Sequence, residues 1–142
     1  MTKIKWCYRK NYEKAIGKCV KDPFPDDGIR IFIARKNDKR NESETISLVF
    51  RFGKDVYCLF SKTNYVIFAI DYCDRKIYFT SGTEQNGYKL YNQPNMKDVM
   101  EFKRTIPEIE YYNIYPYCGL YLIHSLDGKD VHFISFDERI RV

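Results

Sequence analysis

The chain has 142 residues, of which 44% are hydrophobic and 30% are charged. This length and composition predict one folded domain spanning residues 1–142 and exclude a disordered tail. Its 24 basic and 19 acidic residues give a net charge of +5. That charge is compatible with an RNA or membrane-surface partner, but it is far from that of a polybasic arm.

The sequence shows neither a membrane-spanning segment nor a secretory signal. No apolar run approaches the roughly 18 residues that a membrane span needs, and residues 1–8 lack an apolar signal core. We therefore expect a cytoplasmic protein in a reducing compartment. The five cysteines are odd in number and include no CxxC pair, which favours free thiols over a zinc site. His124 and His132 also lack metal-ligand spacing, so neither a metal nor another cofactor is expected.

The apolar pattern changes along the chain. Residues 2–8 alternate polar and apolar side chains and predict a short strand, whereas a spacing of three to four over 10–21 predicts an amphipathic helix. From residue 29 the period becomes two, with a charged loop expected at 36–44. The predicted strands of this region are 29–34, 45–52, 56–60, 65–72, 77–81 and 88–92.

Segment 65–72 is apolar on both faces, so we expect it at the centre of the sheet. A second helix is predicted over about 95–104, with Pro94 near its start and Pro107 after its end. Residues 110–121 are aromatic and are read as irregular.

Segment 122–126 leads into a turn, and the tail that follows is weakly patterned. Together these elements predict an α+β fold. It contains a mostly antiparallel sheet of about five to six strands, an N-terminal helix and a second helix after the meander.

Motifs of the commoner enzyme classes are missing. The sequence contains no GxGxxG, P-loop, HExxH or GxSxG pattern. The remaining feature of the sequence that indicates a function is the order and spacing of its tyrosines.

The informative segments are Phe68-Ala-Ile-Asp71, Tyr78, Tyr88-Lys-Leu-Tyr91, the helix predicted at about 95–104, and Pro116-Tyr-Cys-Gly-Leu-Tyr121. This succession resembles the N-terminal half of the ribosome-inactivating proteins, the rRNA N-glycosylases of plants and some bacteria. The resemblance spans about residues 2–128 and is mostly one of pattern rather than identity. It departs from the family in having about two extra residues between Asp71 and Tyr78.

The resemblance implies that Tyr78 and Tyr121 bind an adenine between their rings. Depurination requires the base to leave its stack, and aromatic faces can hold the extruded base. The partner implied is the ribosome, through its large-subunit rRNA, and the biological role is inhibition of translation in defence or as a toxin. No cofactor is implied.

Catalysis in this family also needs a Glu-x-x-Arg helix, which we expect beyond residue 142. The local matches Glu101–Arg104 and Glu138–Arg141 are read as solvated charge. Holding a base equally well before and during bond breaking lowers no barrier, so we expect this chain alone to be inactive or nearly so. Half of a larger fold would also expose apolar surface, through which we expect self-association.

Two other function classes stay open. One is a non-catalytic RNA- or ribosome-binding module, which the positive charge and the 13 tyrosines fit. The other is an unrelated β-rich domain that uses aromatic side chains at a protein interface.

Overall fold

The computed structural model describes residues 24–38 and 43–140. The strand predicted over 2–8 and the helix predicted over 10–21 lie outside these residues. Within them, ten strands form two five-stranded sheets in which all the strand pairs are antiparallel. The mostly antiparallel α+β class is confirmed, but two sheets replace the single sheet that the sequence predicts.

The first sheet has the strand order β6-β7-β2-β1-β8. Its strands are β1 (Gly28–Asp38), β2 (Ser43–Gly53), β6 (Tyr91–Asn92), β7 (Val99–Thr105) and β8 (Gly119–Leu122). The second sheet has the order β5-β3-β4-β10-β9. Its strands are β3 (Tyr65–Asp71), β4 (Lys76–Ser81), β5 (Tyr88–Lys89), β9 (His124–Ser125) and β10 (Val131–Ser135).

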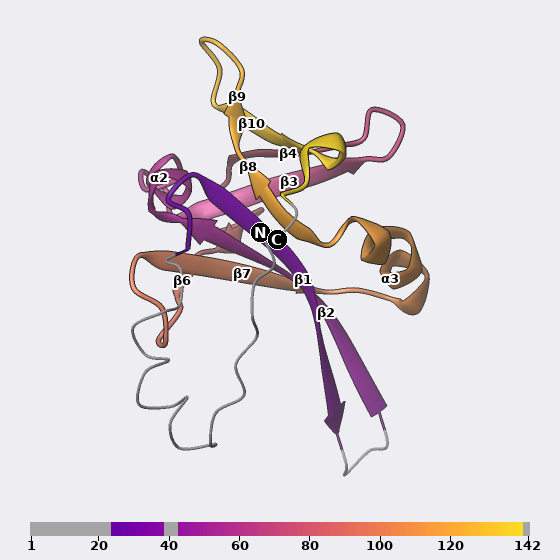
Figure 1. Ribbon diagram of the computed structural model, residues 1–142. Coiled ribbons are helices and arrows are strands. Elements are labelled where there is room, and N and C mark those ends of the chain that lie inside the picture. The colour runs from indigo at the N-terminus through magenta and orange to yellow at the C-terminus, as the bar shows by residue number, and fades with distance from the viewer. Residues whose placement is uncertain (1–23, 39–42, 141–142) are drawn as a thin grey trace, which may run out of the picture.

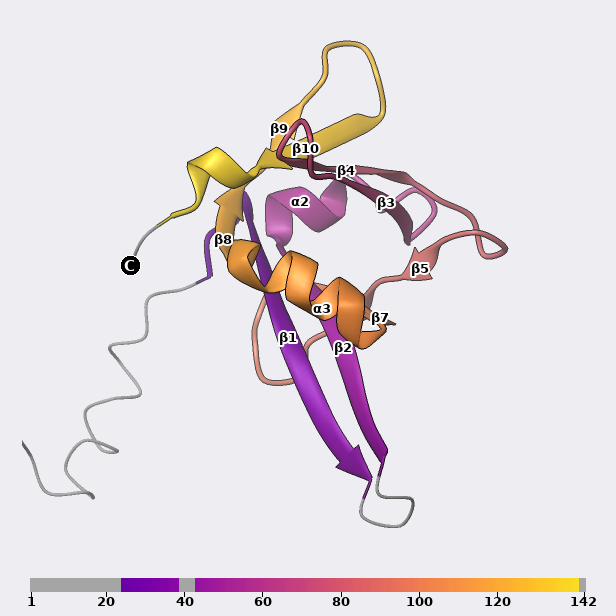
Figure 2. The ribbon, with the colours of Figure 1, turned by 90° about the vertical axis from the view of Figure 1, so that its right-hand side faces the viewer.

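Short helices connect these strands. They are the α-helices α2 (Lys54–Cys58) and α3 (Glu108–Ile114) and the 3₁₀ helices η1 (Tyr115–Tyr117) and η2 (Phe136–Glu138). Figure 2 shows α3 lying across β1 and β2, so one helix covers part of the first sheet.

The hairpin of β1 and β2 is longer than the strands beside it. β8 pairs only with Gly28–Ile31 of β1, and β7 pairs with Ser47–Gly53 of β2. The far end of the hairpin therefore projects from the body of the protein as a two-stranded ribbon (Figure 1).

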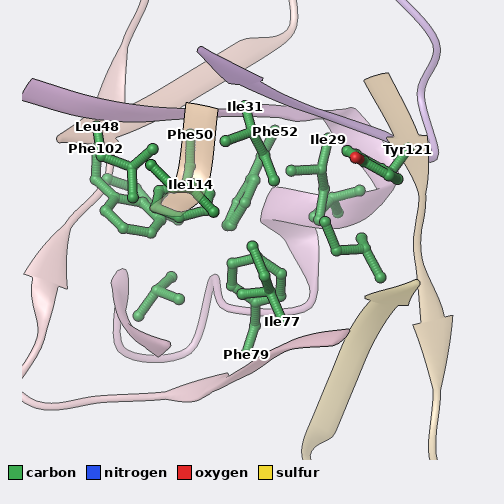
Figure 3. Packing of buried hydrophobic residues seen from close by; sticks show 14 of the residues in the cluster. Ile29, Ile31, Leu48, Phe50, Phe52, Ile77, Phe79, Phe102, Ile114 and Tyr121 are labelled. Carbon is green, nitrogen blue, oxygen red and sulfur yellow. The ribbon is translucent and has the colours of Figure 1, made fainter. Parts of the chain in front are cut away.

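The core lies between the inner faces of the two sheets. Alternate residues of β2 point inward, and Phe50 and Phe52 meet Phe79 of β4 at ring-centroid distances of 5.6 and 5.5 Å. Figure 3 shows these rings in the cluster, with Ile77 beside Phe79. This packing orients both sheets and fixes which side chains of each strand can reach the surface.

The helix predicted over 95–104 is wrong. Residues 99–105 form β7, in which Phe102 pairs with Phe50 of β2. Met100 and Phe102 pack toward the core, while Glu101 faces the opposite side and pairs with Arg51. A partner strand more than 40 residues earlier in the sequence therefore decides this conformation, and a local window of residues does not contain that partner.

The strand predicted over 56–60 is also wrong, because residues 54–58 form α2 and bury Val56. A short apolar run fits a buried strand and a buried helical turn equally well. The strand predicted over 65–72 is confirmed as β3, but β4 and not β3 is the middle strand of the second sheet, and β5 pairs with β3 only at Tyr65 and Val66. The outward residue Ala69 of β3 is exposed, so β3 is not covered on both faces.

Two regions that the sequence predicts to be irregular or weakly patterned form helices and strands in the structure. Residues 110–121 contain most of α3, then η1 and most of β8, and the tail contains β10. β10 pairs with β4 in the interior of the second sheet. No helix among the residues that the structure describes is long and apolar enough to cross a membrane.

Candidate functional site

Tyr121 is part of the core. It lies on β8 opposite Ile29 of β1, and its side chain is 0% exposed. Its hydroxyl donates a hydrogen bond to the carbonyl of Tyr117, and burial raises the pKa of Tyr121 to about 12. Figure 3 places Tyr121 beside Ile29 at one end of the core. As packed here, its ring has no face open to a ligand.

Tyr78 lies on the outer face of the second sheet. Its neighbours on β4, Ile77 and Phe79, are buried, so strand alternation turns Tyr78 away from the core. Its hydroxyl donates a hydrogen bond of 2.7 Å to Asp74. This bond raises the pKa of Tyr78 and lowers the pKa of Asp74.

The structure does not bring Tyr78 and Tyr121 together. Tyr121 is packed in the core between the two sheets, whereas Tyr78 lies on the outer face of β4. A purine could reach Tyr78, but it could reach Tyr121 only if the core opened. Their role as an adenine-stacking pair stays a prediction from the resemblance.

Glu101, Arg104, Glu138 and His124 are partly or fully exposed, whereas His132 is buried and shares hydrogen bonds with Ser125 and Asp130. Arg141, the last residue of the second Glu-x-x-Arg match, lies outside the residues that the structure describes. Glu101 pairs with Arg51, whereas Arg104 pairs with Glu110 on the other side of β7. The Nε2 atom of His124 shares a hydrogen bond with the carboxylate of Glu138. Within residues 24–38 and 43–140, no three His, Cys, Asp or Glu residues cluster as metal ligands.

A patch of large exposed side chains on α3 and η1 is the most distinctive surface feature. We call Ile109, Tyr111, Tyr112 and Tyr115 the α3 aromatic surface. Ile109, Tyr112 and Tyr115 are 71%, 65% and 59% exposed. The ring centroid of Tyr111 lies 5.3 Å from the ring centroids of both Tyr112 and Tyr115. The guanidinium carbon of Arg35 lies 4.3 Å from the ring centroid of Tyr111.

Local sequence explains how α3 forms. Pro107 precedes the helix at its N-cap, and Glu108 and Glu110 occupy the first turn, where carboxylates favour the helix dipole. Ile114 faces inward and is buried. The proline followed by two glutamates was the signal that could have predicted this helix.

The charges around the α3 aromatic surface leave it slightly acidic. Arg35 pairs with Glu44, and Arg104 pairs with Glu110 at 3.8 Å. Glu108 accepts a hydrogen bond of 3.2 Å from the hydroxyl of Tyr112 and has no cationic partner among the described residues. Among these described residues the acidic side chains outnumber the two arginines, so the surface has no net positive charge to attract a phosphate.

A pocket of about 290 Å³ lies beneath α3, at the open end between the two sheets. Its apolar walls come from β2, β3 and the turn after β7, and its rim carries Arg104, Glu110 and Asn113. Tyr72 also lines it, and burial raises the pKa of that phenol. A second, larger hollow of about 520 Å³ lies where β5 and β6 pass β7, beside the exposed ring of Tyr91.

Comparisons of this chain with protein-family models, with curated proteins and with solved structures give no match.

Proposed function

We propose that this chain is a non-catalytic protein-binding domain and that the α3 aromatic surface is its binding site. The proposal depends on one observation: the large side chains of Ile109, Tyr112 and Tyr115 are all exposed on one short helical segment. Exposed aromatic side chains in a contiguous patch are typical of protein interfaces, and tyrosines are frequent among the residues that dominate binding energy.

The charge distribution favours a protein over RNA as the partner. Residues 1–23 hold seven of the 24 basic residues and two of the 19 acidic ones, so residues 24–142 carry 17 of each. The region that holds the α3 aromatic surface therefore has no net charge, and a carboxylate beside each of its two arginines offsets the positive charge there. We expect a partner with an apolar contact surface and basic residues at its rim, facing Glu108.

Site-specific photocrosslinking of the full chain tests this proposal. A benzophenone amino acid replaces Tyr115 in one variant and Tyr91, which is 60% exposed and lies on β6, in the control variant. We expect protein adducts from position 115 that are missing from position 91 and that disappear in an Ile109→Ser background.

Binding of the purified adduct protein then gives the energetic test. Tyr112→Ser should weaken binding at least about tenfold, whereas Tyr91→Ser should change it less than about twofold. Equal losses at both positions, adducts to RNA alone, or no position-specific adduct would contradict the proposal.

We propose this function in place of rRNA N-glycosylase activity because stacking of adenine on Tyr121 would require the core to open. Incubation of the purified chain with ribosomes, followed by aniline treatment of the rRNA, tests this replacement. Aniline-dependent cleavage would restore the depurination proposal and would show that the chain is an enzyme.

A further inference from the structure

The pocket beneath α3 combines apolar walls with a charged rim. Leu48, Ile106 and Ile114 are nearly or fully buried, and Phe68 and Ile70 are partly buried around them. The volume of about 290 Å³ is just below the size range of small-molecule sites, about 300–1,000 Å³. The apolar part can therefore take one medium-sized hydrocarbon or aromatic group.

The rim carries two opposite charges side by side. The guanidinium of Arg104 lies 3.8 Å from the carboxylate of Glu110, and both side chains are 43% exposed. An ion pair this long and this exposed contributes little stability, about 0–1 kcal/mol. A ligand can therefore separate the two side chains with little loss of free energy and can interact with both charged groups.

We propose that this pocket binds a free apolar α-amino acid. The carboxylate of the ligand accepts hydrogen bonds from Arg104, its ammonium donates to Glu110, and its side chain enters the apolar part. Only one carbon separates the two charged groups of an α-amino acid, which suits two protein charges that are themselves neighbours. A simple anion would meet Glu110, and a simple amine would meet Arg104, so neither satisfies the whole rim.

This inference is independent of the proposed protein-binding function. Ile109 and Tyr112 do not line the pocket, and Leu48 and Ile70 do not belong to the α3 aromatic surface. Ile109→Ser should therefore leave amino-acid affinity unchanged, so either proposal can fail alone.

Isothermal titration calorimetry of the full chain with L-leucine and L-phenylalanine provides the test. The comparison ligands are phenethylamine, which lacks the carboxylate, 3-phenylpropionate, which lacks the ammonium, and L-aspartate, which lacks the apolar side chain. We expect at least one of the two apolar amino acids to bind at least about tenfold more tightly than all three comparison ligands. No saturable binding of either amino acid up to about 10 mM, or equal binding of the amine or the acid, would overturn the proposal.

Variants of the rim identify the site. Arg104→Gln and Glu110→Gln should each weaken amino-acid binding at least about tenfold. The matched control is Arg51→Gln, because Arg51 of β2 pairs with Glu101 of β7 on the outer face of the first sheet, and neither residue lines the pocket, so it should have no effect. Asn113→Trp places a large ring at the rim from an exposed helix position and should block binding while the thermal midpoint stays unchanged. Unchanged affinity in Arg104→Gln would show that the ligand binds elsewhere and would reject this site.

Discussion

Phe50 shows how much of this fold can depend on one side chain. It is 0% exposed, and its ring centroid lies 4.8 Å from that of Phe68 and 4.9 Å from that of Phe102. It therefore contacts β3 of the second sheet and its own neighbour β7 at the same time.

Phe50→Ala should destabilise the protein by about 3–5 kcal/mol, because it removes a buried ring and leaves a cavity between the sheets. Urea unfolding followed by circular dichroism measures this loss. Tyr91→Ala, at an exposed aromatic position, is the control and should cost less than about 0.5 kcal/mol. Similar losses in the two variants would show that Phe50 is not a central packing residue.

At the scale of single elements, β7 is the clearest case of tertiary structure overriding a local pattern. Residues 99–105 were predicted within a helix, yet they pair with β2 from Gly53 to Ser47. The backbone N–H of Ile106 donates to the carbonyl of Ile46. Because hydrogen-bonded residues alternate along an antiparallel pair, the N–H of Arg104 points toward Leu48 of β2, whereas the N–H of Lys103 points away from β2.

Proline substitutions distinguish the strand from the predicted helix. Arg104→Pro should destabilise the protein by about 3 kcal/mol, because it removes a hydrogen bond of the ladder. Lys103→Pro should cost clearly less, because its N–H faces away from β2. A helix over this segment would make the two substitutions similar. Thermal or urea unfolding of both variants gives the comparison.

At the scale of the whole molecule, burial couples stability to alkaline pH. Burial raises the pKa of Cys118 to about 11 and that of Tyr121 to about 12, against ordinary values of 9.0 and 10.0. Both groups lose their protons at lower pH in the unfolded chain than in the folded one. Their stabilising contribution is complete below about pH 9 and is lost as the pH rises through their folded-state pKa values.

The free energy of unfolding should therefore fall from about pH 9 upward. Tyr121→Phe keeps the ring in the core but removes the ionising hydroxyl, so its stability should fall less steeply above about pH 10. Urea unfolding at several values between about pH 8 and about pH 11 measures both slopes. Parallel curves for the wild type and Tyr121→Phe would contradict a buried, protonated Tyr121.

Local patterns predicted the strands that alternate most regularly. β1 and β2 were found because apolar residues such as Ile31 and Phe50 recur every second position, and β3 and β4 because turn residues separate their apolar runs. The aromatic surface was missed, since 110–121 was read as irregular although Pro107 and two glutamates mark the start of α3. The rim of the pocket could not be predicted, because Arg104 and Glu110 meet only when β7 and α3 are both in place.

The mostly antiparallel α+β class could be predicted from local sequence, because the alternation of apolar and polar side chains that marks a strand is visible in neighbouring residues. Only the tertiary structure decided that the strands divide into two sheets, that Tyr121 packs inside while Tyr78 faces out, and that β7 and β10 are strands. These outcomes depend on partners distant along the chain, and burial between two faces is a property of the assembled sheets rather than of any local window.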